Sequence, residues 1–363
     1  MRRTLHIVTC LAATLWAQAE ACTGISLATT GNAYIQARTI EWGNFDLQSK
    51  LIVSPQGRSY TAMLPDGKEG LAWTSKLGFV GISVSSDRFI GEGMNEAGLT
   101  AGLFYFKGYG SLAPYDPDDT ADNITDMDFV RWMLSQFRTV DEVKAALDGI
   151  KIVPVHIDEK GMPSPTAHWR VTDRNGNSIV IEIIDQGRVT IHDNPVGVLT
   201  NAPGFEWQLL NLNNYVSLKP GTAAPRRFGE HVARSFGVGT AFRGLPGDVS
   251  PPSRFVRAAF FVATAPPLQT ATDAVSQAFH ILHNFDIPLG VEFGKAEREH
   301  MPDLPSATQW TAVSDQTNGA FYFTSMHDST VRKVDLSRID FTQSSETAQP
   351  LDAGEFTVQD ITP

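Results

Sequence analysis

One cysteine lies at the point where the chain changes in character. Cys22 follows Ala19, Glu20 and Ala21, and small residues at 19 and 21 are what a signal peptidase accepts. A cut between Ala21 and Cys22 would leave a cysteine that carries its own free α-amine. An α-amine has a pKa of about 8, so it can exchange a proton with the thiol near neutrality. The pattern therefore indicates a thiol nucleophile and its base in one residue, suited to attack on an amide carbonyl.

The segment before this cysteine is typical of a secretory signal. Arg2 and Arg3 form a positively charged start, and residues 5–16 form an apolar run that is too short to cross a bilayer. No later stretch is long and apolar enough to do so. We therefore expect residues 1–21 to be a cleaved signal peptide and residues 22–363 to form a single domain. The expected location is the periplasm or the exterior of a bacterium.

Three other interpretations of Cys22 remain open at this point. A lipidated cysteine would make the chain a lipid-anchored periplasmic binding protein, but a lipobox prefers leucine where Ala19 stands, and Glu20 is charged. The cysteine could also be inert and buried. A papain-like protease would need the cysteine within a helix and a partner histidine, whereas a β-rich run follows Cys22. The other cysteine, Cys10, lies in the expected signal, so the mature chain could form no intramolecular disulfide.

Composition narrows the possible ligands. The chain has 363 residues, 42% hydrophobic and 19% charged, with a formal net charge of −11. A nucleic acid or an anionic membrane surface is a poor partner for such a chain. The sequence lacks a cysteine cluster for zinc, and no further ligand pattern joins His280 and His283. We expect no metal and no cofactor, and a small-molecule substrate.

The elements that must position Cys22 form two groups of strands, each followed by helices. Short β-rich runs fill residues 24–106, beginning with 24–28 and 33–37 on either side of a turn. Strands return over 168–171, 178–184 and 189–192. Helical spacing is predicted over 126–137, 140–147, 227–236 and 272–284, with Thr272 or Asp273 as the cap of the last, and a helix is expected to begin near 253. This grouping indicates an α+β fold with layered sheets.

Six short motifs in order carry a resemblance. They are Cys-Thr-Gly at 22–24, Arg-Thr-Ile-Glu-Trp at 38–42, Gly-Met-Asn-Glu-Ala-Gly-Leu at 93–99, Val-Leu-Thr-Asn at 198–201, Leu-Pro-Gly-Asp at 245–248 and Ser-Arg-Phe-Val-Arg at 253–257. The ordered set resembles the choloylglycine hydrolase and penicillin V acylase family of N-terminal nucleophile amidases, and its Gram-negative secreted branch in particular. The resemblance implies a four-layer αββα sandwich with two stacked antiparallel sheets. It also implies a possible homotetramer.

The resemblance implies a catalytic role for each matched position. Cys22 would be both nucleophile and base, and the charge of Arg38 beside the sulfur would favour the thiolate. Asn201 would donate its amide to the developing oxyanion, a contribution of roughly 3 kcal/mol. Arg254 would complete the charged ring around the site. The family commonly has aspartate in contact with the α-amine where this chain has Glu41, whose reach is about one methylene longer.

The family also suggests what the pocket binds. Bile-salt-cleaving members commonly carry asparagine in the strand after Ala-Gly-Leu, and penicillin-cleaving members carry tyrosine. Phe104 and Tyr105 stand there in this chain, and the strand register decides which of them faces the site. With Trp42 they are the expected substrate-binding residues; Trp73, Phe79 and Phe106 are further aromatic candidates. The expected reaction is hydrolysis of a linear, non-peptide amide, with penicillin V first, then long-chain N-acyl homoserine lactones and conjugated bile salts.

Overall fold

A six-stranded antiparallel sheet carries the N-terminal part of the domain. The computed structural model describes residues 20–43, 45–156, 166–291, 308–343 and 345–362, so almost all of the expected signal lies outside it. Across this sheet the order is β14 (Val198–Leu199), β1 (Glu20–Ala28), β2 (Tyr34–Trp42), β17 (Thr308–Asp315), β18 (Ala320–Ser325) and β19 (Arg332–Asp335). β2 and β17 are buried at nearly every position because both faces of the sheet are covered.

A larger antiparallel sheet stacks against the first. Its order is β13 (Arg188–Asp193), β12 (Ser178–Ile184), β11 (Ala167–Thr172), β8 (Thr100–Tyr105), β7 (Ser86–Asn95), β6 (Phe79–Val84), β3 (Lys50–Ser54) and β20 (Thr347–Pro350). Strand pairs outside the two sheets are β4 (Ser59–Met63) with β5 (Glu69–Thr74), parallel β9 (Asn123–Thr125) with β10 (Lys151–Val153), and β15 (Arg226–Phe228) with β16 (His231–Ala233).

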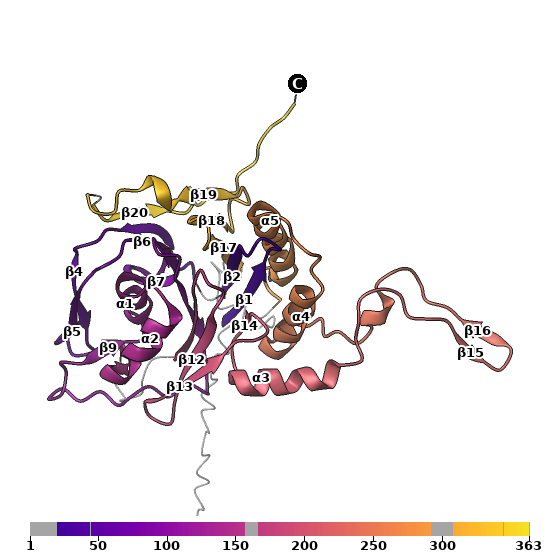
Figure 1. The fold of residues 1–363 in the computed structure, drawn as a ribbon, viewed down its shortest axis with the longest axis horizontal. Coiled ribbons are helices and arrows are strands. Elements are labelled where there is room, and N and C mark those ends of the chain that lie inside the picture. The colour runs from indigo at the N-terminus through magenta and orange to yellow at the C-terminus, as the bar shows by residue number, and fades with distance from the viewer. Residues whose placement is uncertain (1–19, 44, 157–165, 292–307, 344, 363) are drawn as a thin grey trace, which may run out of the picture.

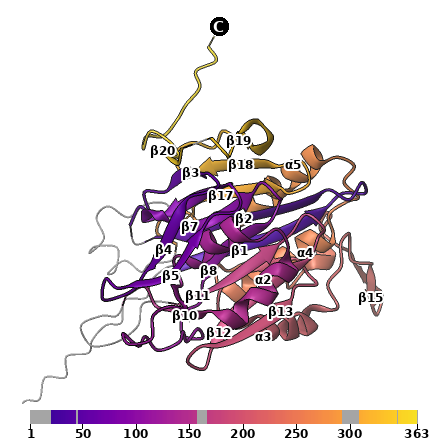
Figure 2. The same ribbon diagram turned by 60° about the vertical axis from the view of Figure 1, so that its left-hand side comes forward.

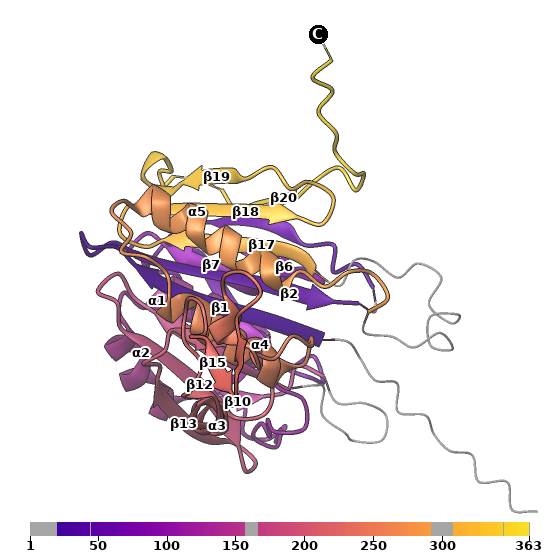
Figure 3. The same ribbon diagram turned by 90° about the vertical axis from the view of Figure 1, so that its right-hand side faces the viewer.

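Helices cover the outer face of each sheet. α1 (Phe129–Gln136) packs on β7 and β8, and α2 (Val140–Ala146) contributes to the same hydrophobic core as α1. On the far side, α4 (Pro251–Ala263) and α5 (Ala271–Leu282) pack on β1, β2 and β17, next to the short α3 (Phe205–Asn211). Figure 1 shows the resulting order of helices, sheet, sheet and helices, and Figure 3 shows α4 and α5 in front of the smaller sheet. The expected αββα sandwich is confirmed. None of the described helices has the length and apolar composition that a bilayer crossing requires.

The long strand β1 places the cysteine between the two sheets. β1 pairs with β2 along its whole length, from Glu20 opposite Trp42 to Ala28 opposite Tyr34, and Figure 2 shows the two strands side by side. Apolar side chains of β1, β2, β8 and α5 pack into one hydrophobic core that includes Cys22. The nucleophile expected from the sequence therefore lies in a rigid part of the fold, which suits a group that must be held in a fixed geometry.

Three helix predictions are corrected by the structure. The helix expected over 227–236 is wrong: this segment forms the β15–β16 hairpin, which turns at Gly229 with φ +59° and projects away from the body of the protein (Figure 1). A projecting segment has no surface against which an amphipathic helix could bury one face. The helix expected from 126 begins only at Phe129. The cap of α5 is Thr270, which forms a capping box with Asp273.

Candidate active site

The register of β1 sets the position of the candidate nucleophile. Cys22 lies opposite Ile40, and two residues later Gly24 lies opposite Arg38, so the side chains of Cys22 and Arg38 share one face of the sheet. Gly24 is required there by close packing. A Cβ at this position would overlap the guanidinium of Arg170 and come within 2.7 Å of the Phe104 ring. The Cys-Thr-Gly motif therefore combines the thiol with the space that a neighbouring buried arginine needs.

Arg38 contacts the thiol directly. Its Nη2 atom donates to the Cys22 sulfur at 2.8 Å, while Nη1 donates to the carbonyl oxygens of Gly91 and Leu103 at 3.0 and 2.5 Å. The guanidinium also lies 4.3 Å from the centre of the Phe104 ring, a cation–π contact. Burial raises the pKa of the Cys22 thiol, and the charge of Arg38 is the largest influence that opposes this rise. Arg38 thus favours the thiolate, which is the role that the family resemblance implies for it.

Asn201 joins the cysteine to the second sheet. Its Oδ1 accepts from the backbone N–H of Cys22 and from Nη2 of Arg254, each at 2.8 Å, and its Nδ2 donates to the Tyr105 carbonyl at 2.9 Å. These three contacts fix the amide plane beside the nucleophile. One amide hydrogen is used by Tyr105, and an amide NH₂ carries a second. The predicted donation to an oxyanion would need that second hydrogen.

Arg254 lies at the start of α4 and connects the same groups. Nη1 donates to the carbonyl oxygen of Cys22 at 2.5 Å and to the Thr23 hydroxyl at 2.9 Å, and Nε donates to the Val249 carbonyl at 2.9 Å. The side chain is fully buried. Because it bonds to backbone and to Asn201 in fixed directions, Arg254 orients the residues on either side of the thiol. The charge also lowers the pKa of the Cys22 thiol, less strongly than Arg38.

The side chain of Glu41 lies on the opposite face of the sheet from that of Cys22, next to the peptide bond between Ala21 and Cys22. Its partner across β1 and β2 is Ala21, and its side chain is buried, with the Thr308 hydroxyl 3.5 Å from Oε1. The carboxylate raises the pKa of the Cys22 thiol. The acid therefore stands next to residue 21, where an α-amine on Cys22 would begin.

A histidine and a glutamate support the segment that carries Asn201. Nε2 of His168 donates to the Thr200 carbonyl at 3.0 Å, and its Nδ1 lies 3.2 Å from Oε1 of Glu182. Glu182 also accepts from the backbone N–H of Phe205 at 2.8 Å. Although burial opposes ionisation, the hydrogen bond with His168 and the approach of His192, whose Nε2 lies 3.4 Å from Oε2, lower the pKa of Glu182 to about 2. This network was not found from the sequence, since its members come from separate strands with no motif.

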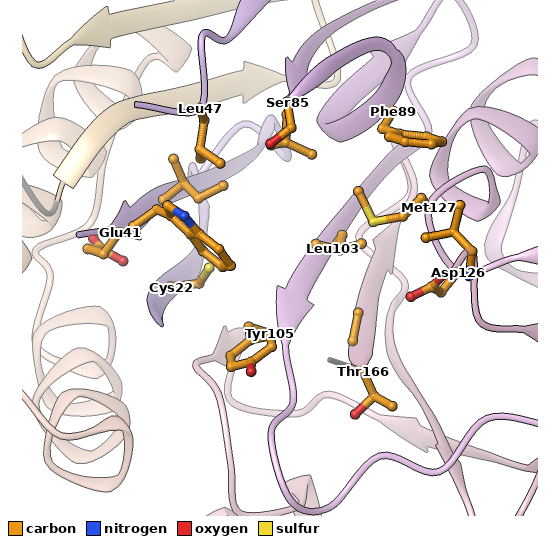
Figure 4. Close-up of a pocket in the computed structure, with 15 residues that line it drawn as sticks. Cys22, Glu41, Leu47, Ser85, Phe89, Leu103, Tyr105, Asp126, Met127 and Thr166 are labelled. Atoms are coloured by element: carbon orange, nitrogen blue, oxygen red, sulfur yellow. Dashed lines mark hydrogen bonds between the residues drawn. The ribbon is translucent and has the colours of Figure 1, made fainter. Parts of the chain in front are cut away.

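A largely apolar pocket of about 260 Å³ opens beside the sulfur. Trp42 and Tyr105 line it, with their rings in an edge-to-face contact 6.1 Å apart. Figure 4 shows Cys22, Glu41 and Tyr105 on one side of the pocket, and Phe89, Met127 and Asp126 on the other. The complete lining is Cys22, Ile40, Glu41, Trp42, Leu47, Val84, Ser85, Phe89, Leu103, Tyr105, Asp126, Met127, Val155, Thr166 and Ala167.

Phe104 is not among these lining residues. Side chains alternate along β8, so Leu103 and Tyr105 face the pocket while Phe104 lies against Arg38 between the sheets. The further aromatic candidates are core residues: Trp73 stacks on Tyr60, Phe106 stacks on His168, and Phe79 is fully buried outside the pocket. The register question that the sequence left open is thus answered in favour of Tyr105.

The comparison with protein families agrees with this geometry. A model of the linear amide C–N hydrolases, choloylglycine hydrolase family, matches residues 22–349. The chain belongs to this family. The family is named for the reaction of its members, and the chain is therefore a linear amide C–N hydrolase. The family match begins at Cys22 itself, the residue on which the thiol chemistry depends.

Curated relatives carry two kinds of name. The chain is similar to a bile salt hydrolase/transferase of Clostridium perfringens, 30% identical over 321 residues that cover 87% of this chain and 93% of the relative. It is also similar to a penicillin V acylase of Pectobacterium atrosepticum, 27% identical over 88% of this chain and 81% of the relative. Among solved structures, a mutant conjugated bile acid hydrolase from Clostridium perfringens superposes with a TM-score of 0.80 at 26% identity, covering 94% and 100% of the two chains.

The structure brings together all five residues that the hydrolase family pattern implied for catalysis. Arg38, Asn201 and Arg254 each contact Cys22, and Glu41 lies beside it. In the described ranges no group of three or more histidine, cysteine, aspartate or glutamate side chains could hold a metal ion. Sequence reasoning missed Asp126, Phe89 and Leu103 in the pocket. Asp126 escaped notice because the spacing of its neighbours placed it inside a predicted helix.

Proposed function

We propose that this hydrolase cleaves a linear amide with an apolar acyl group through a thioester on Cys22, with a preference like that of a penicillin V acylase. The observation that carries the proposal is the contact between the Cys22 thiol and Arg38 at the wall of an apolar pocket lined by Trp42 and Tyr105. The pocket suits a phenoxyacetyl or fatty acyl group, because apolar and aromatic walls gain from desolvating such a group. Long-chain N-acyl homoserine lactones are a second substrate class of the same kind.

We further propose that removal of residues 1–21 during export activates the enzyme. The backbone nitrogen of Cys22 cannot act as a base while it is part of a peptide bond. As a free α-amine it can bind a proton near neutrality. Two observations support this: the family match begins at Cys22, and Glu41 stands opposite Ala21, where it would stabilise a protonated amine. Export would place the mature enzyme in the periplasm or outside the cell.

In the proposed reaction, the α-amine takes the thiol proton and the sulfur attacks the amide carbonyl carbon. The carbonyl oxygen becomes an oxyanion that accepts from the second amide hydrogen of Asn201. The C–N bond then breaks, and the protonated α-amine returns its proton to the leaving nitrogen. Water next adds to the thioester, with the α-amine taking the water's proton, and the carboxylic acid leaves as the C–S bond breaks. The thiol is thereby regenerated.

Conjugated bile salt hydrolysis is the alternative substrate preference. The names of relatives such as the Clostridium perfringens protein favour it. The tyrosine that lines the pocket of this chain favours the acylase side, because a member with asparagine in this strand would offer a polar contact here. The two preferences are separated by measuring kcat/KM on penicillin V, glycocholate, taurocholate and acyl-homoserine lactones of several chain lengths. Cys22→Ala is the control, and a higher kcat/KM on glycocholate or taurocholate than on penicillin V would contradict the proposed preference.

A lipid-anchored binding protein is the alternative from another class, since a diacylglycerol on Cys22 would block both thiol and amine. Intact mass of the exported protein distinguishes the two. The proposal expects a chain that begins at Cys22 with no adduct, whereas a lipid adduct or a chain that retains residues 1–21 in its active form would contradict it. The homotetramer stays a prediction, which light scattering of the mature protein tests.

A further inference from the structure

A buried carboxyl group stands inside the apolar pocket, away from the thiol. Asp126 is only 2% exposed and lines the pocket on the side opposite Cys22, next to Met127 and Phe89 (Figure 4). It follows β9 and precedes α1, in the turn where a helix was expected from the sequence. Burying a carboxyl group against apolar side chains costs free energy, so its presence in a binding pocket calls for a compensating role.

The carboxyl group is held in a fixed direction. The backbone N–H of Val155 donates to Oδ1 of Asp126 at 2.9 Å, and the backbone N–H of Asp126 donates to the Val153 carbonyl at 3.1 Å. These bonds tie the turn to the end of β10. Val155 is itself a lining residue, so the hydrogen-bonded pair forms part of the pocket wall.

Nearby charges leave this carboxyl group available to a ligand. The neighbouring Asp128 is paired with Arg88, whose Nε and Nη2 atoms each donate to it at 2.7 Å. Among the described residues Asp126 itself forms no ion pair within 4 Å, whereas Asp128 is paired with Arg88. Burial raises the pKa of Asp126 to about 7, and the charge of Asp128 adds to the rise. Near neutral pH the carboxyl group of Asp126 is therefore present in both its protonated and its ionised form, and a ligand can meet either.

We propose that Asp126 forms a polar subsite at the distal end of the acyl pocket, which binds a hydroxyl group on the acyl chain of the substrate. This inference rests on the proposed function, since it names the acyl class that the amidase prefers. A hydroxyl group is the partner that fits both forms of the carboxyl group: it donates to a carboxylate and accepts from a carboxylic acid. Phe89, Met127 and Val155, which line the pocket with Asp126, are apolar, which suits the carbon chain that leads to the hydroxyl.

The experiment compares matched substrates that differ by one oxygen atom. Octanoyl 4-nitroanilide is compared with its monohydroxylated forms, with the hydroxyl at each carbon from the third to the last. For at least one position the mature wild-type enzyme is expected to show a kcat/KM about tenfold or more above that of the unsubstituted compound, since a buried hydrogen bond of this kind discriminates by that order. Asp126→Leu, which keeps the size but removes the polar group, should bring this ratio to one or below.

Two controls keep the result specific to the carboxyl group. Met127→Leu alters the neighbouring wall and should retain the hydroxyl preference. Asp126→Asn keeps an acceptor for Val155 and a hydrogen-bonding end, so it should keep part of the preference. Equal ratios in the wild-type and Asp126→Leu enzymes, or no favoured hydroxyl position in the wild type, would overturn the proposal.

A binding measurement separates this inference from the proposed reaction. Octanoate and the hydroxyoctanoate with the favoured hydroxyl position are titrated calorimetrically into two proteins, Cys22→Ala and the double variant Cys22→Ala with Asp126→Leu. If the wild type cleaves no anilide, no position is known to be favoured, and the whole hydroxyoctanoate series is titrated. Tighter binding of a hydroxylated acid that is lost with Asp126→Leu supports the subsite even where no anilide is cleaved. Absence of anilide hydrolysis by the wild type contradicts the proposed function alone, whereas hydrolysis without hydroxyl discrimination contradicts the subsite alone.

Discussion

The sulfur of Cys22 and the Nη2 atom of Arg38 are 2.8 Å apart, and both side chains are buried. Burial raises the pKa of the thiol, and Arg38 is the strongest of the groups that lower it. Glu41, on the opposite face of the strand, raises it. The reactive form of the cysteine therefore depends on charges of opposite sign, and removal of Arg38 and removal of Glu41 should shift the thiol pKa in opposite directions.

Replacement of Arg38 by methionine should raise the thiol pKa further. A nearby opposite charge typically shifts a pKa by about 1–3 units, so the midpoint of thiol alkylation should move to higher pH by an amount of this order. The rate of reaction with iodoacetamide, measured across pH, gives this midpoint. The exposed Arg174→Met is the matched control and should leave it unchanged. An unshifted midpoint in a folded Arg38→Met protein would show that the contact does not stabilise the thiolate.

Replacement of Glu41 by glutamine should move the same midpoint to lower pH. Loss of the carboxylate removes a group that raises the thiol pKa, and it leaves the proposed α-amine without its acid. We therefore expect faster alkylation near neutrality together with a lower kcat/KM on amides. Glu69→Gln, an exposed change on β5, should alter neither quantity. If alkylation and amide hydrolysis changed in the same direction, the proposed role of Glu41 beside the amine would be wrong.

Replacement of Asn201 by alanine should lower kcat by about 10²–10³, the usual effect of losing one oxyanion donor. The same change removes the acceptor shared by Cys22 and Arg254. Single-turnover kinetics on penicillin V measures acylation, and the exposed Asn214→Ala serves as control. If the Asn201→Ala enzyme were acylated at the wild-type rate, other donors would have to stabilise the oxyanion.

Replacement of Glu182 by glutamine tests the network behind Asn201. The hydrogen bond with His168 and the nearby His192 lower the pKa of Glu182 to about 2, from an ordinary value of about 4.5 in the unfolded chain. A depressed pKa stabilises the fold above the unfolded value, and this stabilisation is lost as the pH falls toward 2. The Tm difference between wild type and Glu182→Gln should thus be largest near neutrality and shrink between about pH 4.5 and 2.

The control for that experiment is Asp185→Asn at an exposed position. The backbone of residue 185 is in the left-handed region, which asparagine tolerates. Its Tm should follow the wild type across the same range of pH. A constant Tm difference for Glu182→Gln at all pH values would mean that the glutamate acts through packing and not through its charge.

Much of the site was accessible from the sequence because it lies in short ordered motifs. Cys22 and Arg38 are on adjacent strands joined by a short turn, so their pairing follows from local structure. Asn201 and Arg254 were placed by the family resemblance, since nothing in the residues alone brings positions so far apart in the chain together. The αββα layers came from the same source, because groups of strands that are each followed by helices indicate only an α+β fold with layered sheets.

The remaining features depend on tertiary packing. The register of β8 decides that Tyr105 faces the pocket and Phe104 does not, and a strand with apolar residues on both faces gives no alternation from which to predict it. Residues 227–236 have helical spacing but form a hairpin in a projecting arm. Asp126 lies just before α1, where one turn more or less of helix changes which way a side chain points.

The pairing of β1 on both sides of the Ala21–Cys22 bond bears on the order of events in maturation. Ala21 and Cys22 are both buried, and they pair with Glu41 and Ile40 in the middle layers of the fold. A peptidase needs a segment that is both extended and accessible, and a buried strand paired within a finished sheet is extended but not accessible. Under the proposed export route, cleavage must therefore come before this sheet closes. A chain that folds first, for example when made in the cytoplasm with its leader attached, would be trapped as a stable but inactive precursor.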